Sequence, residues 1–336
     1  MSKITLFTGP AGSYYYFKDK ILEHIRSGDS DAYIYILPVN RAVRHFKKQL
    51  VIHSDSRALI DPPVFTFPAL MRVIYDHFRD KKKIIPAALR LLHLQHVLEK
   101  HGDRLEYLDF KTYSAPGLIS RIDKMLSELS QFGYRPGNFG PPPHTAECRY
   151  RDLEKLLNWL YESYNDEYID ETMIPAEVAG QLDDDAIQNV FPGLKNIYIN
   201  GYGIYTPPML KILSKIGQKY RVSVKLEYDT DNPVLFAHTR NAYDALNKIS
   251  AKNEHISGQF SELKNQLFRH DISPAKPDTE LSSYTLMAAK NRDEEVRYIA
   301  AKIRELHQLQ NIPLHKFSVT FPDIEKYAPI TYNLIE

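Results

Sequence analysis

The N-terminal stretch constrains the fold more than any other part of the sequence. An apolar run, Ile4–Phe7, leads into the turn residues Gly9–Ser13. Beyond them, the large side chains of Tyr14, Phe17 and Ile21 recur three to four residues apart, which is the period of a helix with one buried face. A buried strand, a glycine turn and a helix in this order predict the opening unit of an α/β fold.

The same stretch follows the first half of the phosphate-binding P-loop pattern, G-x-x-x-x-G-K-[ST], and departs from the second half. Three tyrosines stand where the pattern requires Gly, Lys and Ser or Thr. A phenol ring blocks the close approach of phosphate, carries no charge at pH 7 and holds its oxygen too far out for Mg²⁺. The degenerate nucleotide-binding residues are therefore expected to be Gly9, Gly12, Ser13, Tyr14, Tyr15 and Tyr16. The alternative is a strand-to-helix turn that never bound phosphate.

A second loss of the same kind follows the predicted strand Ile197–Ile199. In P-loop ATPases a strand of this type ends in an Asp that helps to hold Mg²⁺, and in helicase-like members a Glu that acts on the attacking water comes next. Here the strand is followed by Asn200 and Gly201, which supply neither the carboxylate charge nor a base. Because both losses would disable one reaction, the sequence favours an ATPase-like frame without hydrolysis over a simple turn.

Strands and helices continue to alternate after the first unit. Further strands are expected at 32–37, 64–66, 196–199 and 221–227. The run at 32–37 is apolar enough to suit a buried strand of a parallel sheet. The predicted fold is α/β: a P-loop NTPase (RecA-like) parallel sheet in two segments, 1–84 and 186–232, interrupted by an all-helical insertion at 85–185. A connector with helices, 233–282, and the start of a second α/β domain, 283–336, complete the expected organisation.

The C-terminal part is expected to hold two strands, at 283–289 and 315–321, with a helix between them. Asn291 followed by Glu294 resembles a capping box at the start of this helix. A further helix is expected from Ile324 onward. Since this βαβα unit is incomplete, the sequence is predicted to be part of a longer protein.

Composition excludes several classes of protein. Hydrophobic residues make up 43% and charged residues 25%, as in ordinary globular proteins, and no apolar run is long enough for a membrane span. A single cysteine, Cys148, excludes an internal disulfide framework. With no export signal at the N-terminus, the expected location is cytoplasmic. No metal or cofactor is expected in this part of the protein.

A net charge of +1 gives no general attraction to nucleic acid, so DNA contact would require a local patch. The helix after the second strand provides one candidate, because Arg41, Arg44 and Lys48 share a face. These residues are the candidate DNA-binding side chains. A solvated helix surface would carry the same residues.

The order of several segments resembles the N-terminal part of AddB-type subunits of bacterial helicase–nuclease complexes, which belong to the PD-(D/E)XK nuclease family. The similar segments are GPAGS at Gly9–Ser13, LPVNRA at Leu37–Ala42, VFTFPAL at Val64–Leu70, GLISRIDKMLSELSQFGYRP at Gly117–Pro136, INGYGIYTP at Ile199–Pro207 and NRDEEVRYIAAKI at Asn291–Ile303. The resemblance implies a superfamily-one helicase-like region with a helical insertion after its first three strands.

The resemblance also implies a function and partners. These are the processing of double-strand DNA ends for recombinational repair, contact with DNA, and an AddA-type helicase–nuclease subunit. The full-length protein is expected to be an exonuclease whose nuclease domain and iron–sulfur cysteines lie beyond this sequence. The expected role of this part is a non-catalytic, DNA-engaging scaffold that has lost ATP hydrolysis. Two alternatives are a protein-interaction module without DNA affinity and a P-loop protein that still binds ATP.

Overall fold

The computed structural model describes residues 2–9, 15–54, 58–108, 116–142, 146–230, 232–256 and 285–335. The chain forms two compact units. The first contains residues 1–260 and 264–271, and the second contains residues 261–263 and 272–336.

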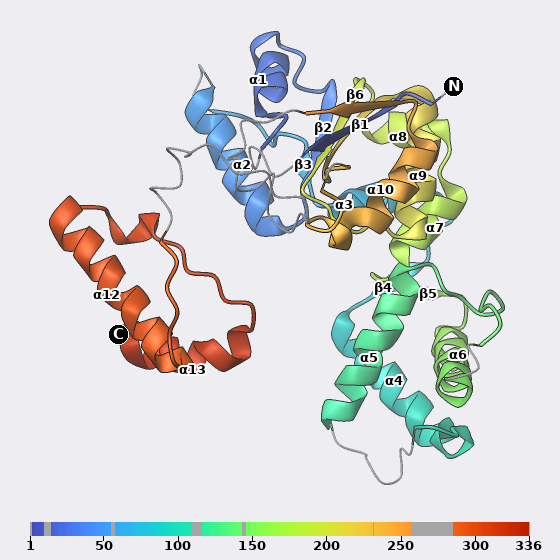
Figure 1. Cartoon of the computed structure of the whole chain (residues 1–336). Coiled ribbons are helices and arrows are strands. Elements are labelled where there is room, and N and C mark those ends of the chain that lie inside the picture. Colours follow the sequence, from blue (N-terminus) through green and yellow to red (C-terminus); the bar gives the residue numbers. More distant parts are fainter. Residues whose placement is uncertain are drawn as a thin grey trace. The chain divides into compact units, whose positions relative to one another are not determined.

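A six-stranded sheet organises the first unit (Figure 1). Its strand order is β3-β2-β6-β7-β1-β8. Its strands are β1 (Ile4–Gly9), β2 (Tyr33–Ile36), β3 (Val64–Phe65), β6 (Asn196–Asn200), β7 (Arg221–Glu227) and β8 (Lys252–His255). Each pair of neighbouring strands is parallel. The predicted α/β class and parallel sheet are therefore confirmed.

Helices cover both faces of this sheet because its strands carry large apolar side chains on both sides. They include α1 (Lys18–Arg26), α2 (Asn40–His53), α3 (Phe67–Tyr75), α9 (Pro207–Lys219) and α10 (Arg240–Ile249). On one face, the aromatic rings of Tyr35 and Tyr198 form a core with α1 and α2. On the other, aliphatic residues such as Ile34 and Val224 form a core with α3, α9 and α10. α1 follows β1 on one face of the sheet, and α10 follows β7 on the other. The connections that leave these two neighbouring strands therefore turn to opposite faces.

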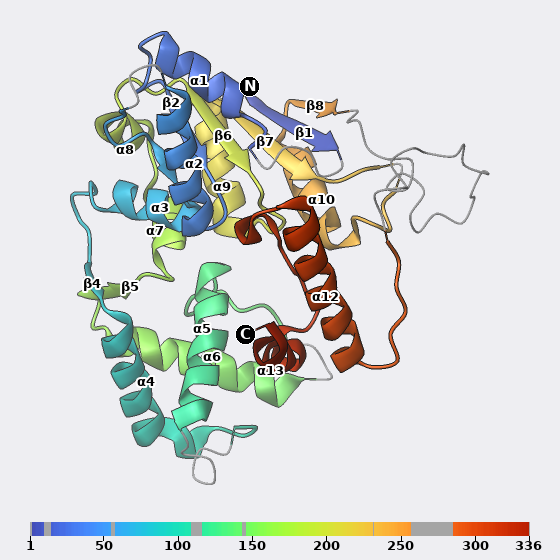
Figure 2. The same ribbon diagram turned by 90° about the vertical axis from the view of Figure 1, so that its left-hand side faces the viewer.

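β8 is a strand that the sequence did not predict. Its residues, Lys-Asn-Glu-His, are polar and mostly exposed. It pairs with β1 at the edge of the sheet, where a polar strand is tolerated because one side faces water (Figure 2).

The insertion between α3 and β6 is not all-helical, so that prediction is wrong. Its elements are β4 (Lys83–Ile85), α4 (Ala87–His101), the short 3₁₀ helix η1 (Gly102–Arg104), α5 (Pro116–Gln131), α6 (Glu147–Ser163), β5 (Tyr168–Asp170), α7 (Ile174–Gln181) and α8 (Asp184–Val190). β4 and β5 form a separate two-stranded parallel sheet beside the helices (Figure 2). Strands of three residues are too short to show an alternating pattern, so no periodicity indicated them.

A buried ionic cluster ties the insertion together. Arg90 on α4 is 3% exposed and donates to Asp123 on α5 at 2.6 Å and to Asp170 on β5. Asp170 also accepts from the Tyr164 hydroxyl at 3.1 Å and from the backbone N–H of Thr172 at 2.8 Å. Three elements distant in sequence are therefore held by one guanidinium group.

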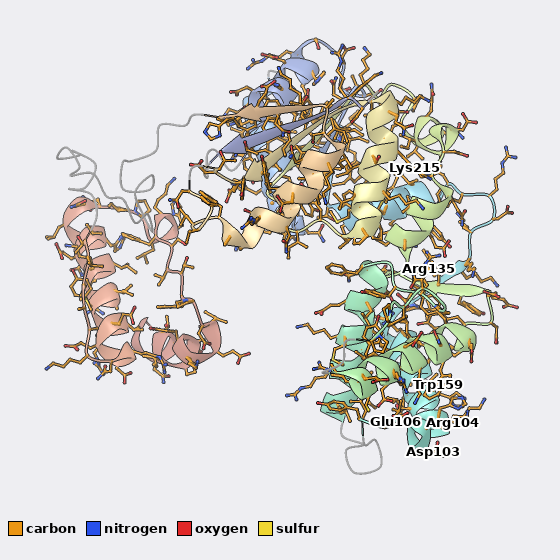
Figure 3. The ribbon with its side chains drawn as sticks, turned by 45° about the vertical axis from the view of Figure 1, so that its right-hand side comes forward. Asp103, Arg104, Glu106, Arg135, Trp159 and Lys215 are labelled. Carbon is orange, nitrogen blue, oxygen red and sulfur yellow. The ribbon has the colours of Figure 1, made fainter. Side chains whose placement is uncertain are left out.

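Three further contacts each involve a residue that is labelled in Figure 3. At one end of the insertion, the Trp159 ring stacks on His101 with the centroids 4.8 Å apart. At the other end, Arg135 forms an ion pair of 3.1 Å with Glu177 on α7. On α9, Lys215 donates to the Leu182 carbonyl at 2.9 Å, which links the end of α7 to the helices of the sheet.

The second unit is helical in its described part. It contains α12 (Arg292–Gln310), a short 3₁₀ helix η4 (Leu314–Lys316) and α13 (Ile324–Ile335). The N-cap at Asn291 is confirmed, because its side chain accepts from the Glu294 N–H at 2.9 Å. The Glu294 side chain accepts from the N–H of Lys290, one residue before the N-cap, at 2.8 Å.

The strands expected in this unit are not formed at residues 285–289 and 315–321, so those predictions are wrong; residues 283 and 284 lie outside the described part. Val319, in the middle of the expected second strand, is 37% exposed. A strand needs a neighbour for its backbone hydrogen bonds, and residues 285–335 provide none. A second α/β domain is therefore not seen in the described residues.

Candidate functional site

The described site residues lie toward the carboxyl ends of the strands in the main sheet. Gly9 ends β1, Asn200 ends β6, and α2 begins shortly after β2. In open parallel α/β sheets, ligands bind at this edge, at the point where the connections of neighbouring strands turn to opposite faces. That point falls between β1 and β7. The predicted residues Gly12, Ser13 and Tyr14 lie outside the described residues.

Gly9 occupies a position that excludes other residues. Its φ is +156°, and a Cβ built on it would lie 2.6 Å from the Ile256 carbonyl oxygen. The cause is the close approach of the chain after β8, where the Ile256 N–H donates to the Thr8 carbonyl at 2.7 Å. The glycine is therefore explained by packing at the edge of the sheet, whether or not a phosphate binds.

Tyr15 and Tyr16 are partly buried against the aromatic core. The Tyr15 hydroxyl lies 2.7 Å from Nδ1 of His45 on α2, and its ring is 4.7 Å from that of Phe46. The Tyr16 ring lies 5.7 Å from Phe7, and burial, together with the nearby Glu254, raises the pKa of Tyr16. Tyr15 thus connects the segment after the glycine turn to the basic helix α2.

Asn200 and Gly201 follow the expected strand, and the structure gives each a structural role. Asn200 is 5% exposed, and its side-chain amide donates to the Tyr35 hydroxyl at 3.3 Å. Gly201 has a φ of +85°, and a Cβ there would lie 3.2 Å from the Pro38 ring. β7 separates Asn200 from β1, so Asn200 and Gly9 lie at the same edge of the sheet with one strand between them.

Lys225 on β7 is a residue of this edge that the sequence reasoning missed. It is 4% exposed, and its ammonium group donates to the Gly9 carbonyl at 3.0 Å and to the Leu226 carbonyl at 3.1 Å. Burial lowers the pKa of Lys225 to about 8. One signal in the sequence could have indicated it: Lys225 lies inside a strand of a parallel sheet that is covered on both faces, where a lysine cannot reach solvent.

Tyr202 joins the loops that follow two other strands. Its hydroxyl accepts from the Phe67 N–H at 2.9 Å and donates to the Leu37 carbonyl at 3.0 Å. Burial raises the pKa of Tyr202 to about 12. The start of α3 and the segment before α2 are therefore held by one phenol.

The basic helix α2 contains no acidic residue, and no side chain caps its first turn. Arg41, Arg44 and Lys48 are exposed and form no ion pair or side-chain hydrogen bond within the described part of the chain. Lys47, by contrast, pairs with Asp61 at 2.8 Å. An open helix N-terminus with cations nearby favours anions, because its free N–H groups and its dipole are positive.

Neither a metal centre nor a membrane segment is found in the described residues. No group of three or more His, Cys, Asp or Glu side chains there is placed to hold a metal ion. In the same residues, no helix has the length and apolar character needed to cross a membrane.

The fold defines the class of the protein: an open, parallel α/β sheet with its candidate site at the carboxyl edge and a largely helical insertion before β6. Comparison with family models matches residues 7–275 to the family described as ADDB, N-terminal. Because this match spans most of the chain, the protein belongs to the AddB N-terminal family, and the resemblance is confirmed. No curated protein matches the sequence.

Proposed function

We propose that this chain is a non-catalytic, helicase-like scaffold that engages DNA within an AddB-type helicase–nuclease. In this proposal it works in the cytoplasm on double-strand ends during recombinational repair, with an AddA-type helicase–nuclease subunit as its partner. Membership of the AddB N-terminal family supports the end-processing role.

The observation that carries DNA engagement is the acid-free helix α2. Arg41, Arg44 and Lys48 are exposed and unpaired within the described residues, next to an uncapped helix start. Cations of this kind bind DNA phosphates without reading the base sequence, which suits a protein that must accept any DNA end. The contact of Tyr15 with His45 would keep this helix beside the edge of the sheet.

Two features support a RecA-like frame without ATP hydrolysis. β7 lies between β1 and β6, so the ends of these two strands, where the phosphate loop and the magnesium acid would stand, share one edge of the sheet with a single strand between them. Asn200 stands where that acid would be, and its amide is engaged with Tyr35. An amide cannot supply the negative charge that the acid brings to Mg²⁺.

DNA engagement is tested by fluorescence anisotropy on a labelled forked duplex at two salt concentrations. The variant combines Arg41→Gln, Arg44→Gln and Lys48→Gln. If all three residues contact phosphate, the slope of log K against log salt falls in magnitude by about two to three, at roughly 0.7–0.9 per contact.

A matched control removes two arginines and one lysine from the second unit. It combines Lys290→Gln, Arg297→Gln and Arg304→Gln, whose side chains are exposed and unpaired in the described structure. The control should bind DNA like the unaltered chain. Equal affinity and equal slope for both variants would refute contact through α2, and no binding by any form would favour the protein-interaction module.

Loss of nucleotide chemistry is tested separately by isothermal titration with ATP and Mg²⁺. No binding is expected, since the lysine and the acid of the motif are both replaced. Micromolar binding would contradict this part of the proposal and favour a P-loop protein that still binds ATP, while leaving the DNA result unaffected.

A further inference from the structure

A hollow at the opposite, amino-terminal edge of the main sheet is lined by four cations. Its volume is about 360 Å³. The amino-edge cations are Lys3, Lys195, Lys219 and Arg221. Gln188, Asn196 and apolar groups complete its wall, and no carboxylate of the described residues lines it.

The pairing of neighbouring strands places three of these cations side by side. β1, β7 and β6 are consecutive neighbours, and Lys3, Arg221 and Lys195 lie at their starts. Val222 donates its N–H to the Lys3 carbonyl and Arg221 donates its N–H to the Lys195 carbonyl, both at 3.1 Å. Neighbouring strands are only about 4.8 Å apart, and like charges at such positions destabilise a sheet.

Their contacts within the protein compensate this charge only in part. Lys3 donates to the Lys219 carbonyl at 2.9 Å and Lys219 to the Gln188 side chain at 2.8 Å, both neutral acceptors. These two cations complement the C-terminus of α9, which explains them without a ligand.

Lys195 and Arg221 lack such an explanation, because they precede or begin strands. Lys195 approaches Asp29 at 3.7 Å, but the two side chains are 66% and 55% exposed, so the attraction is screened by water. Arg221 forms no ion pair within the described residues. The whole chain is nearly neutral, with 43 basic and 42 acidic residues, so this excess of positive charge is local.

We propose that the amino-edge hollow binds a phosphate group, with Arg221 and Lys195 as its main ligands. The guanidinium group presents paired N–H donors that match phosphate oxygens, and lysine adds a mobile point charge. The volume fits a small phosphorylated molecule, and the exposure of both side chains also admits a phosphate of a DNA strand. The site is separate from α2 and does not depend on the function proposed above.

The test compares the full 336-residue chain with the double variant Lys195→Gln, Arg221→Gln. Inorganic tripolyphosphate is titrated calorimetrically, and a labelled single-stranded DNA is followed by anisotropy. Both substituted residues are exposed, so the fold should be retained, and circular dichroism checks this. The control variant Arg121→Gln, Lys124→Gln removes the same charges from exposed positions on α5.

Tripolyphosphate affinity is expected to fall about tenfold or more in the double variant and to stay unchanged in the control, since each charged hydrogen bond is strong. An accompanying loss of DNA affinity, with a shallower salt dependence than the control, would identify DNA as the phosphate source. Loss of tripolyphosphate binding alone would identify a small phosphorylated ligand. If the double variant matches the control in both assays, the proposed site is refuted.

Discussion

Replacing Lys225 by methionine tests whether a charged ammonium group is buried at the carboxyl edge. The pKa of Lys225 is lowered from 10.5 to about 8. At about 1.4 kcal/mol per pKa unit, burial of the charged form costs roughly 3 kcal/mol relative to the unfolded chain. Because Lys225 is 4% exposed, solvent screens little of this cost. Methionine keeps the aliphatic stem, so Lys225→Met is expected to be more stable at pH 7, by up to about 3 kcal/mol.

The pH dependence gives the sharper test. Near pH 7 the lysine is mostly charged in both states, whereas by pH 9.5 the folded state has lost its proton and the unfolded state retains it. The unaltered chain should therefore gain about 2 kcal/mol relative to Lys225→Met between pH 7 and 9.5, because its unfolded state binds more protons. Urea unfolding followed by circular dichroism at both pH values measures this change.

An exposed lysine provides the control for that measurement. Lys211 is exposed on α9, so the stability difference between Lys211→Met and the unaltered chain should be the same at both pH values. A difference for Lys225→Met that is also independent of pH would refute the buried-charge reasoning.

Three further predictions concern single contacts. Arg90→Met should lower the free energy of unfolding by about 3–5 kcal/mol, because it leaves Asp170, 2% exposed, without its cation. Urea unfolding measures this, and a loss below about 1 kcal/mol would contradict it. Gly9→Ala should lower stability by about 1–3 kcal/mol, since the new Cβ would lie 2.6 Å from the Ile256 carbonyl oxygen. An unchanged melting temperature would contradict this prediction, since it would mean that Ile256 moves away from the new Cβ without a loss of stability. Tyr33→Phe should leave stability unchanged or raise it by about 1 kcal/mol, because the buried hydroxyl has no hydrogen-bond partner in the described structure. A marked loss of stability in thermal unfolding would indicate an unseen partner for that hydroxyl.

Local patterns predicted the central part of the fold. β2 is an apolar run and β7 alternates polar with apolar residues, and both lie in the predicted positions. Thr206 followed by Pro207 has the residue types of a helix start, and the Thr206 hydroxyl accepts from the Met209 N–H at 3.5 Å at the beginning of α9. Such signals are readable because strand periodicity and helix capping depend on residues close in sequence.

Contacts between distant segments escaped the sequence reasoning. β8 is polar and forms because β1 offers an open edge, whereas residues 315–321, with alternating polar and apolar side chains, have no strand beside them in the described part of the second unit and form none. The residues around Arg90 in the sequence do not indicate its buried ion pairs, since its two acidic partners, Asp123 and Asp170, lie on other elements. Strand pairing and ion pairing need a spatial neighbour, which local sequence does not specify.

The candidate sites likewise combine residues that the sequence identifies with residues that only the tertiary structure brings together. The sequence alone determined that Tyr15 and Asn200 stand where a P-loop pattern would have its lysine and its acid, because these are identities of residues at positions along a motif. Only the tertiary structure placed Lys225 against the Gly9 carbonyl and aligned Lys3 with Arg221 at the other edge. The physical reason is that charge–charge and charge–dipole energies depend on distance and burial, and both are set by the order of strands in the sheet.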